Sequence, residues 1–77
     1  MANFLDGVEN LKKGDFTKAI EIFEELSKNG DYHASYQLAQ MYNQGLNVKK
    51  DLGVSTEYFD AAFKQLNDAE DSNEKTY

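Results

Sequence analysis

Glycine and aspartate recur together along this chain at intervals that match the length of a short helix. The pairs are Gly14-Asp15 and Gly30-Asp31, and Gly45 follows at a similar distance. Glycine just past one helix and aspartate just before the next are the stop and start signals of consecutive helices. This punctuation predicts a series of short helices joined by tight turns.

Apolar residues recur at helical spacing within each stretch, most clearly over residues 16–28, where the acidic residues lie mainly on the other side. Strict alternation of apolar and polar residues, the pattern of a half-buried strand, is absent from the sequence. We therefore expect an all-α fold with helices over residues 4–13, 16–28, 32–44 and 52–66. The residues expected in the core are Phe16, Ala19, Phe23, Leu38, Tyr42 and Phe59.

The chain has 77 residues, and a domain of this size buries only about 60% of the surface that its unfolded form exposes. Disulfides, a structural metal or a partner commonly reinforce such small domains. Cysteine is absent and His33 is the single histidine, which excludes disulfides and Cys/His metal clusters. We expect no cofactor and no metal, and a partner or a second copy as the reinforcement.

The expected helices fall into two pairs that align with each other, which indicates an internal repeat. The second and fourth helices align at an offset of 36 residues, and the first and third at an offset of 32. A short insertion in the loop over residues 45–50 accounts for the difference. The aligned residues are Asp15 with Asp51, Ala19 with Ser55, Phe23 with Phe59, Leu26 with Ala62, and Gly7 with Ala39.

Two runs of residues resemble a known repeat family. Residues 14–23, GDFTKAIEIF, resemble the second helix of a tetratricopeptide repeat, and residues 34–45, ASYQLAQMYNQG, resemble the first helix of its Sel-one-like variant. The resemblance spans about residues 4–66, and in the second repeat it departs from the family pattern at Ala39, Ser55 and Ala62-Phe63. The first repeat is degenerate because Asp6 stands at a usually apolar position. It implies a tetratricopeptide-like array of antiparallel helix pairs that serves as a protein-binding scaffold.

Residues 67–77, NDAEDSNEKTY, contain little that can be buried. We expect a two-repeat helical domain over residues 1–66, followed over residues 67–77 by an acidic, polar and disordered tail. Such a tail cannot cap the array, so the last helix should present an uncovered apolar edge.

Four aromatic residues are candidates for a protein-binding surface. Phe59 and Phe63 lie four apart on the last helix and cannot both point into the core, so at least one should face outward. Tyr32 and Tyr36 are four apart on one helix face, and an aromatic ring with a polar tip suits an interface as well as a core. A second copy in a two-fold homodimer, or the target itself, is expected to cover this surface.

The charge of the chain limits its partners. The net charge is −6 and every basic residue is a lysine, which opposes direct binding to nucleic acid or to an anionic membrane. No basic stretch followed by an apolar run begins the chain, and no segment approaches the roughly 18 apolar residues of a membrane span. We expect a cytoplasmic protein.

No motif for catalysis is present, and His33 has no nucleophile or carboxylate at a recognisable catalytic spacing. We expect a protein that is not an enzyme but an adaptor or scaffold module that binds a protein or peptide. The alternative is a small acidic inhibitor, such as phages encode, that blocks a basic or nucleic-acid-binding surface of a larger protein.

Overall fold

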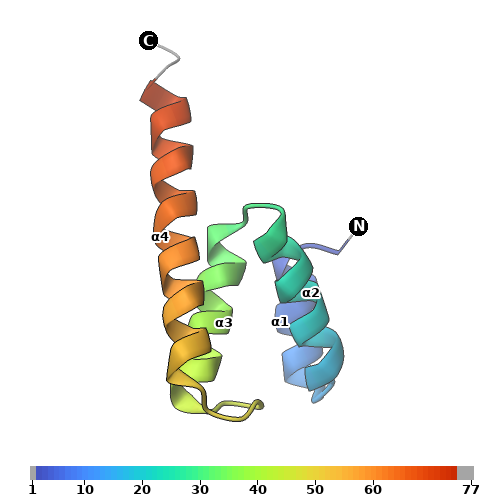
Figure 1. The fold of residues 1–77 in the computed structure, drawn as a ribbon. Helices are drawn as coiled ribbons and strands as arrows, with labels where there is room; N and C mark the ends of the chain where they lie inside the picture. The colour runs from blue at the N-terminus through green and yellow to red at the C-terminus, as the bar shows by residue number, and fades with distance from the viewer. Residues whose placement is uncertain (1, 75–77) are drawn as a thin grey trace.

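In a computed structural model, the chain forms four consecutive α-helices (Figure 1). The structure describes residues 2–74, with side chains over residues 2–69. Within the described residues there is no strand, so the expected all-α fold is confirmed. The helices are α1 (Phe4–Lys13), α2 (Phe16–Lys28), α3 (Tyr32–Gln44) and α4 (Leu52–Glu74).

The helices follow one another in an up-and-down order, and each packs against its neighbour in sequence (Figure 1). The contacts join α1 to α2, α2 to α3, and α3 to α4, as expected for a repeat-like array of helix pairs. Helix α4 lies along one side of the molecule and rises past the end of α3, which gives the protein an elongated outline of 44 × 28 × 15 Å. No helix among the described residues is both long enough and apolar enough to cross a bilayer.

Side-chain caps start the helices where the sequence predicts them. The carboxylate of Asp15 accepts a hydrogen bond from the backbone N–H of Lys18 at 3.2 Å, and Asp51 accepts one from Val54 at 3.1 Å. At α1, Asn3 and Asp6 form a reciprocal capping box with bonds of 2.8 and 3.0 Å. The capping box gives Asp6 a structural role at the start of α1.

Two helices end at glycines in the left-handed region. Gly14 closes α1 with φ 85°, and Gly45 closes α3 with φ 70°. Residues that carry a Cβ atom rarely adopt this backbone conformation, which is why glycine is the usual residue at such helix ends. The glycine signals therefore mark these two helix ends correctly.

The core lies between the first helix pair and α3. Its buried centre is a cluster of Ala19, Phe23, Ala34, Leu38 and Met41. The Phe23 ring has no exposed surface and packs at 5.4 Å, centroid to centroid, from the ring of Phe4. It also lies directly on the backbone of α1 at Gly7, where an added Cβ would be 2.7 Å from its Cζ.

Three expected core residues differ in their burial. Phe16 is 39% exposed because it is the first residue of α2 and precedes the first turn that packs against a neighbour. Tyr42 and Phe59 are half-buried. Tyr42 stacks on Tyr58 at the edge of the core with their centroids 6.0 Å apart, whereas Phe59 faces the outer side of the α3–α4 pair.

The last helix is longer than the sequence pattern predicts. It was expected to end near Leu66, but α4 continues to Glu74. At an offset of 36 residues, Leu66 corresponds to Gly30, where the chain turns from α2 into α3. The glycine stop signal is thus missing at this position, and residues 67–74 continue the helix. Residues 75–77 of the expected tail lie outside the described residues.

Candidate binding groove

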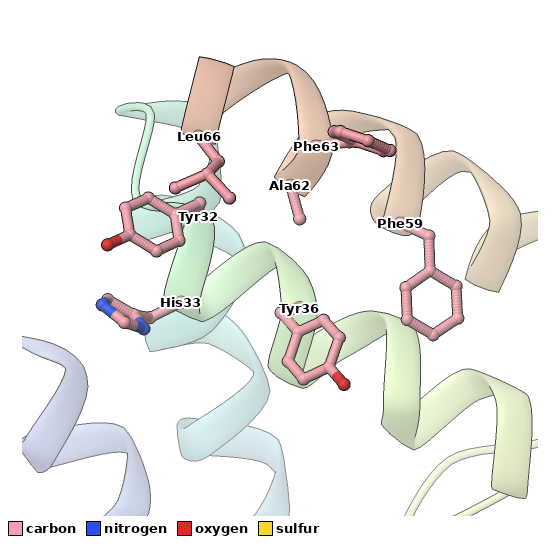
Figure 2. Close-up of a pocket in the computed structure, with 7 residues that line it drawn as sticks. All are labelled: Tyr32, His33, Tyr36, Phe59, Ala62, Phe63 and Leu66. Carbon is pink, nitrogen blue, oxygen red and sulfur yellow. The ribbon is translucent and has the colours of Figure 1, made fainter. Parts of the chain in front are cut away.

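An open groove runs between the outer sides of α3 and α4 (Figure 2). Its volume is about 460 Å³. The structure brings the four residues proposed from the sequence, Tyr32, Tyr36, Phe59 and Phe63, together around this single groove. The complete lining is Tyr32, His33, Tyr36, Phe59, Ala62, Phe63 and Leu66.

Helical spacing places the lining residues in two facing stripes. On α4, Phe59, Ala62, Phe63 and Leu66 follow the spacing of one helix face. Ala62 is buried, and its short side chain leaves the space that the larger residues surround. Phe63 is 67% exposed and Leu66 37% exposed, so much of the apolar surface remains open to solvent.

Aromatic contacts connect the two stripes. The ring of Tyr36 meets the ring of Phe59 edge-on, with 5.8 Å between the centroids and an interplanar angle of 64°. At the other end of the groove, Leu66 lies near Tyr32 (Figure 2). The ring of His33 stacks beside Tyr32 at 4.2 Å and reaches the ring of Phe4 on α1 at 6.0 Å. His33 thus connects the groove to the first helix pair.

Sequence reasoning missed three members of the groove. Ala62, Leu66 and His33 line the groove but were not among the four aromatic residues proposed for a binding surface. The spacing from Phe59 to Ala62 and Leu66 is a signal that these residues share its helix face. Their place in a groove could not be read from that spacing, because it does not say which side of α4 the neighbouring helix covers.

Partly buried hydrogen bonds hold α4 in position beside the groove. The Gln65 side-chain N–H donates to the backbone carbonyl of Ser27 at 3.0 Å, and the Ser35 hydroxyl donates to Gln65 Oε1 at 2.7 Å. The hydroxyls of Ser27 and Ser35 are 2.6 Å apart. Because Gln65 is fixed against α2 and α3, the adjacent Leu66 and the preceding Phe63 are directed to the outer side. Contacts within the chain therefore hold the two sides of the groove in place.

A further buried hydrogen bond holds the first half of α4. Ser55 is buried and its hydroxyl donates to the backbone carbonyl of Ala39 on α3 at 2.8 Å. The bond satisfies the buried hydroxyl and fixes the distance between the two helices that form the groove.

Charged residues lie on α4 outside the groove lining. On α4, Glu57, Asp60 and Asp68 are exposed, as is Lys64. On the side of α4 that faces α2, burial raises the pKa of Tyr58 above its ordinary value of 10.0, and the nearby Glu24 carboxylate adds to this effect. Helix α4 thus carries an apolar stripe on one side and mainly acidic residues on its other sides.

A second hollow of about 430 Å³ lies on α2 and is chemically different. Its lining is mainly charged and consists of Glu21, Glu24, Glu25, Lys28 and Asn29. Among the described residues, no three His, Cys, Asp or Glu side chains gather in a way that could hold a metal ion. This hollow is an acidic surface feature that could attract a basic partner.

No model of a known protein family matches this chain. No solved structure matches it either. The chemistry of the groove is therefore the basis on which a function can be assigned.

Proposed function

We propose that this protein is a protein–protein interaction module, an adaptor or scaffold that binds a protein or peptide in the groove between α3 and α4. The observation that carries the proposal is the open aromatic lining of that groove. Tyr36, Phe63 and Leu66 are all exposed, so their apolar surface does not contribute to the stability of the fold. This loss is considerable in a chain of 77 residues, whose core is small. Contiguous exposed apolar surface of this kind marks sites of association.

The composition of the groove favours binding over catalysis. Its polar groups are the His33 imidazole and the hydroxyls of Tyr32 and Tyr36, and its remaining lining is hydrocarbon. No carboxylate, serine or lysine belongs to the lining set, so a nucleophile and base pair is not assembled there. Large aromatic side chains are the residues that most often anchor protein partners.

The proposal includes the repeat assignment and a cytoplasmic location. The up-and-down helix pairs support two tetratricopeptide-like repeats, and the residues over 34–45 resemble the Sel-one-like variant. Cell fractionation tests the location. A location outside the cytoplasm would remove that part of the proposal and leave the groove argument intact.

Affinity purification of the tagged protein from its native cell, with and without Phe63→Glu, tests the proposal. Leu5→Glu is a matched control. Leu5 and Phe63 are both 67% exposed, and each replacement adds one negative charge, but Leu5 lies on α1 and is not part of the groove lining. We expect the wild type and Leu5→Glu to retain the same partner and Phe63→Glu to retain about tenfold less, which corresponds to about 1.4 kcal/mol. Equal recovery with all three proteins would contradict the proposal.

The acidic hollow on α2 favours a second candidate, an inhibitor that blocks a basic surface of a larger protein. Such binding should weaken sharply as salt is raised, because exposed charges are screened, whereas apolar anchoring should not. Replacing Glu21, Glu24 and Glu25 together by glutamine distinguishes the two. Loss of the partner with this variant and retention with Phe63→Glu would favour the inhibitor.

A further inference from the structure

The two helix pairs contain equivalent aromatic contacts. In the first pair, the rings of Phe4 on α1 and Phe23 on α2 are 5.4 Å apart. In the second pair, the rings of Tyr36 on α3 and Phe59 on α4 are 5.8 Å apart. Phe4 and Tyr36 are separated by 32 residues, and Phe23 and Phe59 by 36, the same offsets that align the helices in the sequence. The contacts therefore occupy the same position in each pair.

A helix covers the first of these contacts. Helix α3 packs on α2, and its residues Ala34, Leu38 and Met41 belong to the same buried cluster as Phe23. These three residues lie four and then three positions apart, so they form one stripe of the helix. The groove between α1 and α2 is thus filled by the next helix of the chain.

The second contact has no such cover among the described residues. Tyr36 is 51% exposed, and the groove beside Phe59 is open. The chain turns back after α2 at Asn29 and Gly30, but at the corresponding position, Leu66, helix α4 continues to Glu74. The chain over residues 66–74 therefore does not return to fill the groove between α3 and α4.

We propose that an α-helix of another protein fills this groove, antiparallel to α4 as α3 is to α2. This inference rests on the proposed function and specifies the structure of the ligand. The internal equivalence supplies the pattern: a small residue, a leucine-sized residue four positions later, and a methionine-sized residue three positions after that. These correspond to Ala34, Leu38 and Met41.

One difference between the pairs refines the pattern. In the first pair, the hydroxyl of Ser27 on α2 meets the hydroxyl of Ser35 on α3 at 2.6 Å. At an offset of 36 residues, Ser27 corresponds to Phe63, which offers no hydrogen-bond partner. The incoming helix should therefore carry a small apolar residue, such as alanine, where α3 carries Ser35. A hydroxyl buried against Phe63 would lose its hydrogen bond.

Charge selects a basic helix over a second copy of this chain. Residues 51–77 hold seven acidic residues and two lysines, and each copy carries a net charge of −6. Pairing the α4 grooves of two copies would bring two chains of the same negative charge together, including the exposed Asp60 beside Phe59 in each. A helix with lysine or arginine on the faces beside its apolar stripe meets the same surface with complementary charge.

A synthetic amphipathic helix tests this inference directly. The peptide carries the stripe of Ala34, Leu38 and Met41, alanine at the position of Ser35, and lysines on its remaining faces. Fluorescence anisotropy measures its Kd for the full chain and for two variants, Phe63→Glu and the control Leu5→Glu. We expect unchanged affinity with Leu5→Glu and a Kd at least about tenfold higher with Phe63→Glu.

Two control peptides separate the apolar pattern from the charge. Aspartate in place of the stripe leucine should abolish binding, and glutamate in place of the lysines should weaken it. Leu66→Glu is a second groove variant, and circular dichroism confirms that each variant remains helical. Binding that is the same for the patterned and the disrupted peptide, or that is insensitive to both groove variants, would overturn the inference.

Two further outcomes are informative. A dimer of the free protein at neutral pH, seen by sedimentation and lost in Phe63→Glu, would make a second copy the occupant and overturn the assignment to another protein. A native partner whose capture depends on Phe63, combined with no binding of the patterned peptide, would overturn the helix inference and leave the proposed function standing. Failure of the proposed function is distinct, since native capture would then be insensitive to Phe63→Glu.

Discussion

Phe23 is the residue on which the fold depends most. Its ring has no exposed surface and joins α1, through Phe4 and Gly7, to the cluster that contains Leu38 on α3. Phe23→Ala should lower the free energy of unfolding by about 3–5 kcal/mol, the range for emptying a buried aromatic site. A small domain has only about 5–15 kcal/mol in total. Thermal denaturation within about two degrees of the wild type would contradict this placement.

Two helical glycines should respond in opposite directions to replacement by alanine. At Gly7 the new Cβ would lie 2.7 Å from Phe23 Cζ, and the buried ring has no room to move. Gly7→Ala should therefore lower the free energy of unfolding by about 1–3 kcal/mol. Gly53 is exposed, and its Cβ would meet only Asp51 Oδ1, at 3.4 Å. Gly53→Ala should stabilise the protein by up to about 1 kcal/mol. Chemical denaturation of both variants measures the two changes in the free energy of unfolding. Changes of the same sign and size would contradict the prediction.

Tyr58 should make the protein less stable in alkali. Burial, and then the charge of Glu24, raise its pKa in the folded protein above 10.0. Below about pH 10 the side chain is protonated in both states and has no effect. Above that, the unfolded chain releases the proton first, so stability falls as pH rises towards the folded pKa.

Tyr58→Phe should reduce this alkaline loss of stability. The free energy of unfolding is compared at about pH 9 and about pH 11 for the wild type and for Tyr58→Phe. Tyr36→Phe is the control, since Tyr36 is half exposed in the groove. An alkaline loss that is the same in all three proteins would show that another group is responsible.

Among the elements, α4 depends on the side chain of Gln65 for its position. Gln65 bonds to Ser27 on α2 and Ser35 on α3, so one side chain connects three helices. Gln65→Ala removes two hydrogen bonds and leaves their partners, the Ser27 carbonyl and the Ser35 hydroxyl, without this contact. The free energy of unfolding should fall by about 1–3 kcal/mol. Asn67→Ala, at an exposed position on the same helix, should change stability by less than about 0.5 kcal/mol. Urea denaturation compares the two, and similar effects would show that the network contributes little.

The extension of α4 shows how strongly helix ends depend on local signals. Helix α1 ends at Gly14 and α3 at Gly45, but no glycine follows Leu66. The helix therefore continues through residues 67–74 even though their composition is polar. The consequence for the site is direct, because Leu66 lines the groove where a turn into another helix would otherwise begin.

For the whole molecule, net charge and the exposed groove act against each other. At neutral pH the charge of −6 should oppose association of two copies, and near the isoelectric point of about 4.5 this repulsion disappears while the apolar groove remains. We expect the wild type to sediment as a monomer at neutral pH and to associate near pH 4.5. Leu5→Glu should behave like the wild type. Phe63→Glu should remain monomeric at both pH values, and association equal to that of the wild type would contradict the role of the groove.

Features that depend on near neighbours along the chain could be predicted from the amino-acid sequence. Asp15, Asp31 and Asp51 each cap a helix through backbone N–H groups two or three residues away. Three helices accordingly have the bounds expected from the sequence, and α4 starts where expected. The exposure of one of Phe59 and Phe63 also followed from their spacing on one helix, since both cannot point into the same core.

Which side of each helix is covered by a neighbour could not be predicted from the sequence. Phe16 and Phe23 lie on the same apolar pattern of α2, yet only Phe23 meets α1 and α3. Leu66 fits a core stripe equally well, but Gln65 is bonded to Ser27, 38 residues earlier, which directs Leu66 to the groove. Burial depends on contacts between residues far apart in the chain, and helical periodicity specifies a face of a helix without specifying what packs against it.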